Sequence, residues 1–179
     1  MPRGELRRKD RAMCDEDCWR LLERAFCGRL GTADADGWPY IVPKLFVVDG
    51  ASIYFHGATA RGHMQANLED NPRVCFEVDE PGPVFPSGEG SQCDTSNAFQ
   101  SVIVFGTCSL VEDHEQKLRA LRLLMRKYAD PAWERPDTFP SLDETAVYEV
   151  AVERMTGKRR SLAVAGQQQD TSPRSGRLP

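Results

Sequence analysis

The stretch that decides the fold is Ile53-Tyr54-Phe55-His56-Gly57-Ala58-Thr59-Ala60-Arg61-Gly62-His63-Met64. Its apolar and aromatic first half is typical of a β-strand, and its second half is typical of the start of a helix. Basic side chains stand at the junction, where the unpaired N–H groups of a helix start favour an anion. The stretch therefore predicts a binding site for a phosphate group.

The basic side chains at this junction each have two interpretations. Arg61 is either a bidentate phosphate ligand or a surface arginine that covers the helix. His63 is either a phosphate donor or a helix-surface residue. His56 is either a site residue or a hydrogen-bonded core residue at the end of an apolar strand. The phosphate role is favoured for Arg61, because Gly62 and the preceding strand accompany it.

The composition is that of one globular domain. The chain has 179 residues, of which 40% are hydrophobic, and a net charge of −4. General affinity for nucleic acid or for an anionic membrane is therefore not expected. No apolar run approaches the ~20 residues of a membrane helix, and no secretory signal is evident, so we expect a cytoplasmic location. The six cysteines and three histidines lack zinc-ligand spacing, so no metal site is expected.

The order of helix and strand signals predicts a mainly antiparallel sheet. Successive strand signals are joined by tight turns, which are too short for parallel crossovers. The mainly β (α+β) pattern suggests a small closed or nearly closed barrel of six strands with peripheral helices. The expected strands span 29–33, 40–48, 53–56, 74–78, 99–111 and 146–152, and the expected helices begin at Asp15, at Thr59 (about three turns long) and at a capping box from Asp113 to Gln116.

The remaining segments complete the expected organisation. Repeated Pro and Gly in residues 80–97 predict a loop. Residues 1–12 form a basic N-terminal arm, residues 13–158 the barrel domain, and residues 159–179 a polar, disordered tail. Cys75 and Cys108 are expected in the core, together with Trp19, Phe26 and Tyr128.

Six pieces of sequence carry a family resemblance through their order and spacing. They are RRKDR at 7–11, PYIVP at 39–43, IYFHGA at 53–58, NPRVCFEV at 71–78, SVIVFG at 101–106 and MTGK at 155–158. Together they resemble the flavin-binding split-barrel superfamily that includes the pyridoxamine 5′-phosphate oxidases. Within that group they are most similar to the nitroimidazole-reductase-like branch. The resemblance covers roughly residues 6–158.

The resemblance implies a homodimeric split β-barrel with flavin mononucleotide (FMN) at the dimer interface. Its strand at 40–46 lies along the flavin ring, its turn at 61–64 binds the phosphate, and its active-site histidine corresponds to His56. Lys44 then either faces solvent or stabilises the reduced, anionic flavin. The implied cofactor-binding residues are Pro43, Lys44, Leu45, Phe55, His56, Gly57, Arg61, Gly62, His63, Met64 and Ser101.

The implied function is that of an oxidoreductase. Electrons pass from a nicotinamide donor, NAD(P)H, to a small acceptor such as a nitroaromatic (nitroimidazole) compound. The donor is expected to bind transiently, because the chain has no Gly-rich nicotinamide fingerprint. The alternative is a haem- or flavin-binding module of the same fold without vitamin B6 oxidase activity. The Trp- and Arg-rich C-terminal segment with which the oxidases hold pyridoxal phosphate has no counterpart in the polar tail.

Overall fold

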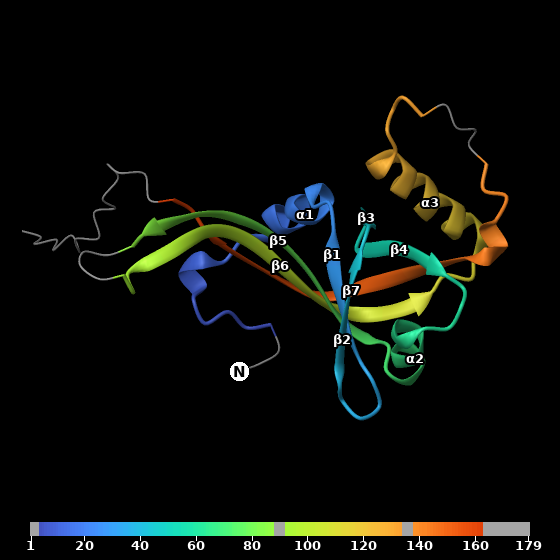
Figure 1. Ribbon diagram of the computed structural model, residues 1–179, viewed down its shortest axis with the longest axis horizontal. Coiled ribbons are helices and arrows are strands. Elements are labelled where there is room, and N and C mark those ends of the chain that lie inside the picture. The colour runs from blue at the N-terminus through green and yellow to red at the C-terminus, as the bar shows by residue number, and fades with distance from the viewer. Residues whose placement is uncertain (1–3, 88–91, 134–137, 163–179) are drawn as a thin grey trace, which may run out of the picture.

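A computed structural model describes residues 4–87, 92–133 and 138–162. Within these residues, seven strands form one antiparallel sheet in the order β2-β1-β5-β6-β7-β4-β3 (Figure 1). The strands are β1 (Gly28–Ala33), β2 (Pro39–Lys44), β3 (Phe46–Asp49), β4 (Ser52–Ala58), β5 (Arg73–Pro86), β6 (Thr95–Leu110) and β7 (Thr145–Arg160). The α-helices are α1 (Asp15–Arg24), α2 (His63–Asp70) and α3 (His114–Tyr128), and two 3-10 turns are η1 (Lys9–Arg11) and η2 (Leu142–Glu144).

The sheet is a split barrel, as expected, but it has seven strands where six were predicted. The single strand expected over 40–48 is wrong, because the chain breaks at Leu45 into β2 and β3. β2 pairs with β1 and β3 pairs with β4, and within the described residues no ladder joins β2 to β3. The two edges of the sheet are therefore consecutive in the chain but are not closed by strand pairing.

The loop predicted over residues 80–97 is also wrong, because β5 and β6 extend into it as a long arm (Figure 1). The pairing of β5 with β6 runs from Arg73↔Thr107 to Pro86↔Thr95, with a register shift between Pro81 and Val84. β1 pairs with β5 at residues 75–77, and along the arm one edge of β5 has no ladder partner among the residues that the structure describes. Proline is tolerated on such an edge because no N–H is required there.

The second helix starts later than the sequence predicted. α2 begins at His63 rather than just after Thr59, and it spans eight residues instead of about three turns. Gly62 is its N-cap residue, and the Gly62 N–H donates to Gln65 Oε1 at 3.0 Å. The side chain of Gln65 thus fixes the helix start, which the sequence assigned to the hydroxyl of Thr59.

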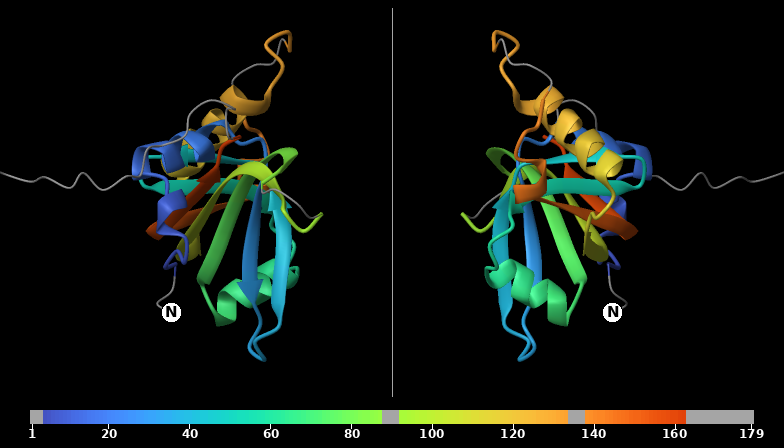
Figure 2. Two further views of the ribbon diagram at one scale, coloured as in Figure 1. Left: turned by 90° about the vertical axis from the view of Figure 1, so that its left-hand side faces the viewer. Right: turned by 90° about the vertical axis from the view of Figure 1, so that its right-hand side faces the viewer.

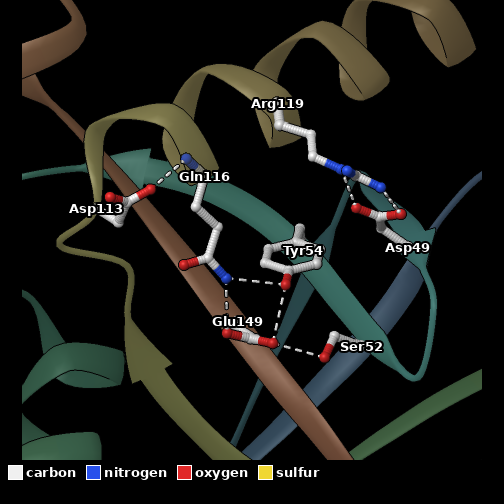
Figure 3. Close-up of polar contacts among 7 residues, drawn as sticks. All are labelled: Asp49, Ser52, Tyr54, Asp113, Gln116, Arg119 and Glu149. Atoms are coloured by element: carbon white, nitrogen blue, oxygen red, sulfur yellow. Dashed lines mark hydrogen bonds and ion pairs between the residues drawn. The ribbon is translucent and has the colours of Figure 1, made fainter.

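The other two helices lie close to their predicted positions. α1 spans Asp15–Arg24, but its N-cap residue is Cys14 rather than Asp15. α3 begins as predicted, since the Asp113 carboxylate accepts the Gln116 N–H at 2.7 Å. The Gln116 amide does not complete a capping box. It donates instead to Tyr54 Oη and to Glu149 Oε2, both at 3.0 Å, which ties α3 to β4 and β7 (Figure 3).

Two apolar clusters stabilise this arrangement. The larger fills the concave side of the sheet, around Phe46, Phe55 and Phe76, and includes Leu21 and Leu22 of α1. The smaller joins residues of α3 to residues of strands β3, β4 and β7. Figure 2 shows α3 (gold) lying outside the sheet. Cys108 is buried as predicted, whereas Cys75 is half-buried on the opposite, outer side. The side chains of Trp19 and Tyr128 pack against the clusters, but the prediction for Phe26 is wrong, because it is 73% exposed.

The chain ends extend the barrel further than expected. β7 continues to Arg160, two residues into the predicted tail, and residues 163–179 of that tail lie outside the described residues. Part of the predicted N-terminal arm forms η1, and Ala12 forms an isolated bridge with Lys158. Among the helices in the described ranges, none has the length and hydropathy needed to cross a membrane.

A buried polar contact holds α2 against the sheet and can be tested by a double-mutant cycle. Asn67 Nδ2 donates to Thr32 Oγ1 at 2.9 Å, and both side chains are buried. We expect Asn67→Ala to lower the free energy of unfolding by about 1–3 kcal/mol, because it leaves a buried hydroxyl without its donor. The Asn67→Ala, Thr32→Val double variant should lose less than the sum of the single losses in urea unfolding. Additive losses would show that the contact carries no coupling energy.

Candidate functional site

The start of α2 has the local geometry of an anion site. β4 ends at Ala58, and Gly62 is extended, with φ −125° and ψ −177°. The Ala66 N–H makes the first helical hydrogen bond, to the Gly62 carbonyl at 3.0 Å. The N–H groups of the first turn before Ala66 therefore lie outside the helical ladder. The first turn has no acidic residue, so its positive potential is not offset there.

Arg61 lies directly before this helix start, but its guanidinium already has an anionic partner. Its Nε and Nη2 atoms contact Glu69 Oε2 at 3.0 and 2.8 Å, and its side chain is 68% exposed. This hydrogen bond lowers the pKa of Glu69 and raises that of Arg61. A phosphate that binds Arg61 would have to replace the carboxylate of Glu69. Breaking this ion pair requires little free energy, because ion pairs between solvent-exposed side chains are weak.

His63 connects the helix start to the edge strand β2. Its ring lies against Tyr40, with ring centroids 5.6 Å apart and an interplanar angle of 30°. Met64, the next residue, packs on the larger apolar cluster. His63 is therefore placed between α2 and β2, and Met64 anchors the same turn to the core.

A second group of predicted residues lies at the adjoining ends of β2 and β4. Lys44 Nζ is 5.3 Å from the centroid of the Phe55 ring, which is fully buried. Burial lowers the pKa of Lys44. The pKa of His56 is lowered mainly by burial and further by the positive charge of Lys44. A Cβ atom on Gly57 would lie 4.0 Å from Lys44 Nζ, so Lys44, Phe55 and Gly57 lie together on one face of β4. His56 alternates with Phe55 and Gly57 along the strand and is affected by Lys44 through its charge.

Two further predicted residues, Pro43 and Ser101, belong to the outer face of the sheet. Ser101 alternates with the buried Val102 on β6, and Pro43 is the register partner of Arg29 on β1. An open groove of about 590 Å³ hollows this face. Its lining includes Arg29, Gly31, Ile41, Cys75, Glu77 and Phe105.

The structure keeps Pro43 and Ser101 apart within one chain. The register runs Pro43↔Arg29, Arg29↔Glu77 and Glu77↔Ile103, which is three strand spacings. The separation along the sheet is therefore roughly 14 Å, with Ser101 two residues further along β6. The predicted cofactor residues thus fall into two groups, one around Lys44 and the start of α2, and the other on the outer face.

Sequence reasoning missed Tyr148, Gln65 and Cys108, which complete the cluster around Lys44. Tyr148 is stacked on Phe55 with ring centroids 5.2 Å apart. Burial raises the pKa of Tyr148, and a side-chain hydrogen bond with Gln65 opposes that rise. Burial also raises the pKa of Cys108 to about 12, so this thiol stays protonated, while the charge of Lys44 acts in the opposite direction. Of these three residues, only Tyr148 could have been found from the sequence, because the alternating pattern of residues 146–152 places its side chain on the inner face of the sheet.

No group of His, Cys, Asp and Glu side chains suited to a metal ion occurs in the described part of the chain. The donors that the chain offers at the α2 start are the guanidinium of Arg61, the imidazole of His63 and backbone N–H groups. This donor set fits a phosphate group better than a metal ion. The residues present therefore fit the phosphate end of a flavin nucleotide.

Solved structures with this fold include several cofactor-binding proteins. A candidate 5-nitroimidazole antibiotic resistance protein from Bacteroides thetaiotaomicron is 26% identical, with a TM-score of 0.69 over 83% of this chain and 86% of that one. An FAD-binding protein from Mesorhizobium loti is 26% identical, with a TM-score of 0.62 over 84% and 98%. A flavocytochrome from Azotobacter vinelandii shares the fold, at 20% identity and a TM-score of 0.75 over 100% and 94%.

Comparison with curated protein sequences gave no match. The sequence profile of the pyridoxamine 5′-phosphate oxidase family, by contrast, matches residues 14–159, which is nearly all of the barrel. This match confirms the family resemblance, and it contains five of the six pieces of sequence, since RRKDR at 7–11 lies before it. The chain belongs to the pyridoxamine 5′-phosphate oxidase family.

Proposed function

We propose that this protein is a flavoprotein that binds FMN and acts as an oxidoreductase on a small acceptor. The observation that carries the proposal is the position of the α2 start, with Arg61 and His63, beside Lys44 and Phe55 at the split of the barrel. Family membership and the FAD-binding protein of the same fold support a flavin. A bound flavin supplies hydride and single-electron transfer.

The residues of this chain divide the work of holding the cofactor. The first-turn N–H groups of α2, Arg61 and His63 would bind the phosphate. Lys44 would place a positive charge near the ring, where it favours an anionic reduced form. Phe55 and Gly57 would shape the wall behind Lys44, and Pro43 and Leu45 would contact the ring from the strand.

Arg61→Ala tests the phosphate site, and Arg119→Ala is a matched control. Arg119 is equally exposed, at 69% compared with 68%, and it also pairs with a carboxylate, that of Asp49, but it lies on α3. We expect Arg61→Ala to weaken FMN binding about 10–100-fold, as a charge-assisted contact is lost. Arg119→Ala should leave binding unchanged. The measurement is quenching of FMN fluorescence on titration into the apoprotein.

The absorption spectrum of the protein as purified decides which cofactor is present. A two-band yellow spectrum, with FMN released on denaturation, is expected, and anaerobic NADPH followed by a nitroimidazole should bleach and then restore it. If the released cofactor is FAD, the protein is still a flavoprotein, but its cofactor is FAD and not FMN. A single Soret band would support the haem alternative, for which the flavocytochrome of the same fold is the relevant precedent. A colourless protein that takes up no flavin would overturn the proposal.

A homodimer forms the second part of the proposal. One flavin ring lying against Pro43 would not reach Ser101 of the same chain, given three strand spacings between the two strands. The two positions can serve one flavin if they come from two copies of the chain. The open groove beside Ile41, whose side chain is 68% exposed, supports coverage of this face by a second copy.

Ile41→Glu tests the dimer, with Met125→Glu as the control. Met125 is 41% exposed but lies on α3, away from the groove. We expect a dimer for the unchanged protein in light scattering, and a monomer with reduced flavin content for Ile41→Glu. Met125→Glu should remain a dimer. A monomeric protein that carries a full complement of flavin would contradict this arrangement.

In the proposed reaction, His56 would orient the acceptor. It lies near the end of β4 with part of its surface open to solvent, and its pKa is lowered by the partial burial of its ring and by the charge of Lys44. The ring is therefore neutral near pH 7 and offers one N–H donor to a nitro or carboxylate oxygen. Because the positive charge of Lys44 lowers the pKa of His56, it helps to keep the His56 ring neutral.

Lys44→Met should raise the pKa of His56 toward its ordinary value of 6.5, without fully restoring it, because burial is the larger cause. A lowered pKa means that the unfolded chain binds the proton more tightly. The contribution of neutral His56 to the free energy of unfolding is therefore fully present above about pH 6.5, and it is lost as the pH falls through the lowered pKa. Lys44→Met should reduce that loss. The measurement is NMR titration of the three histidines, with Lys9→Met as the control, and an unchanged His56 titration would contradict the coupling.

A further inference from the structure

A side chain from a peripheral helix bonds to the backbone beside the split of the barrel. Tyr128 is the last residue of α3, and its hydroxyl lies within hydrogen-bond distance of three backbone groups. These are the Phe46 N–H at 3.0 Å, the Phe46 carbonyl at 2.8 Å and the Phe26 carbonyl at 2.9 Å. The hydroxyl thus contacts the chain on both sides of the split.

The backbone of Phe46 explains why such a contact is needed. Phe46 pairs with Phe55, but β3 is the edge of the sheet, so in the described part of the chain one side of β3 has no strand beside it. The Phe46 N–H and carbonyl both reach Tyr128 Oη and therefore point toward this open side. A buried backbone group without a partner is costly. The Tyr128 hydroxyl supplies the hydrogen-bond partner that a neighbouring strand would otherwise supply to the backbone of Phe46.

The other side of the split is reached through Phe26. Its carbonyl lies two residues before β1, which is the strand that pairs with β2. A hydroxyl has one proton and two lone pairs, so Tyr128 accepts from the Phe46 N–H and donates to one carbonyl at a time. Burial raises the pKa of Tyr128, so this proton is retained at neutral pH.

We propose that Tyr128 is a positioning residue for the flavin-facing segment 43–45. This segment ends at Leu45, directly before the peptide that the Tyr128 hydroxyl holds. The inference rests on the proposed flavin function, but its geometric part, the restraint of Phe46, does not. Tyr128 acts through the backbone and does not touch the cofactor.

Two neighbouring contacts of α3 provide matched controls. Tyr54 Oη also binds a residue of α3, the Gln116 amide at 3.0 Å (Figure 3), but this contact involves the first turn of α3 and no backbone group of Phe46. Lys127 adjoins Tyr128 and contacts the same Phe46, but through the ring, with Nζ 4.2 Å from the centroid. Lys127 Nζ is buried without a hydrogen-bond partner among the described residues, so Lys127→Met removes no backbone restraint.

The experiment compares Tyr128→Phe with Tyr54→Phe and Lys127→Met. In the apoprotein, amide hydrogen exchange of Phe46 should accelerate about tenfold in Tyr128→Phe alone, since its N–H loses its acceptor. In the holoprotein, Tyr128→Phe should weaken FMN binding about five- to tenfold and shift the flavin absorption bands. The two control variants should retain the affinity and the spectrum of the unchanged protein.

The outcomes separate this inference from the proposed function. If the unchanged protein binds no flavin, the function fails, while the exchange of Phe46 still tests the restraint. If flavin binds but Tyr128→Phe leaves both exchange and affinity unchanged, the positioning role is overturned. Equal effects in Lys127→Met or Tyr54→Phe would also overturn it, because they would assign the effect to the docking of α3 as a whole.

Discussion

The structure depends on one constraint of connectivity. β2 and β3 lie at opposite edges of a seven-stranded sheet, yet only Leu45 separates them in the chain. The sheet must therefore coil until its edges meet at that residue. The natural twist of antiparallel strands favours this coiling, and the cluster around Phe46, Phe55 and Phe76 fills the space that it encloses. The barrel is closed by a covalent link where ladder hydrogen bonds are missing.

This constraint also explains where the candidate site lies. At the split, the ends of β2 and β4 come together, which brings Lys44 beside Phe55 and His56. The turn after β4 then brings the start of α2 back to β2, where His63 meets Tyr40. The buried Asn67–Thr32 contact fixes that return. At the split, the side chain of Lys44 is partly removed from water, while the two strand edges beside it remain unpaired with each other.

The sequence predicted the strand-to-helix junction and the capping of α3 by Asp113, because both follow from local patterns. It could not predict the break at Leu45, since 40–48 is a continuous β-rich run and the break is imposed by coiling of the whole sheet. The arm was missed for a related reason. Proline argues against a central strand, and only the pairing partners show that this part of β5 is an edge. Tyr148 and Gln65 were missed because their contacts join segments distant in sequence.

The outer edge of β2 also determines how other chains can meet this protein. The Asp34 N–H bonds to the Trp38 carbonyl at 3.1 Å, and this sets the alternation of the hairpin, so that Pro39, Ile41 and Pro43 direct their backbone away from β1. Two of these three positions have no N–H, because they are proline. The edge is therefore a poor template for an added strand, since only Ile41 of these three positions can donate a hydrogen bond. The apolar surface beside it can be shared with another molecule face to face, without the open-ended polymerisation that an exposed strand edge invites.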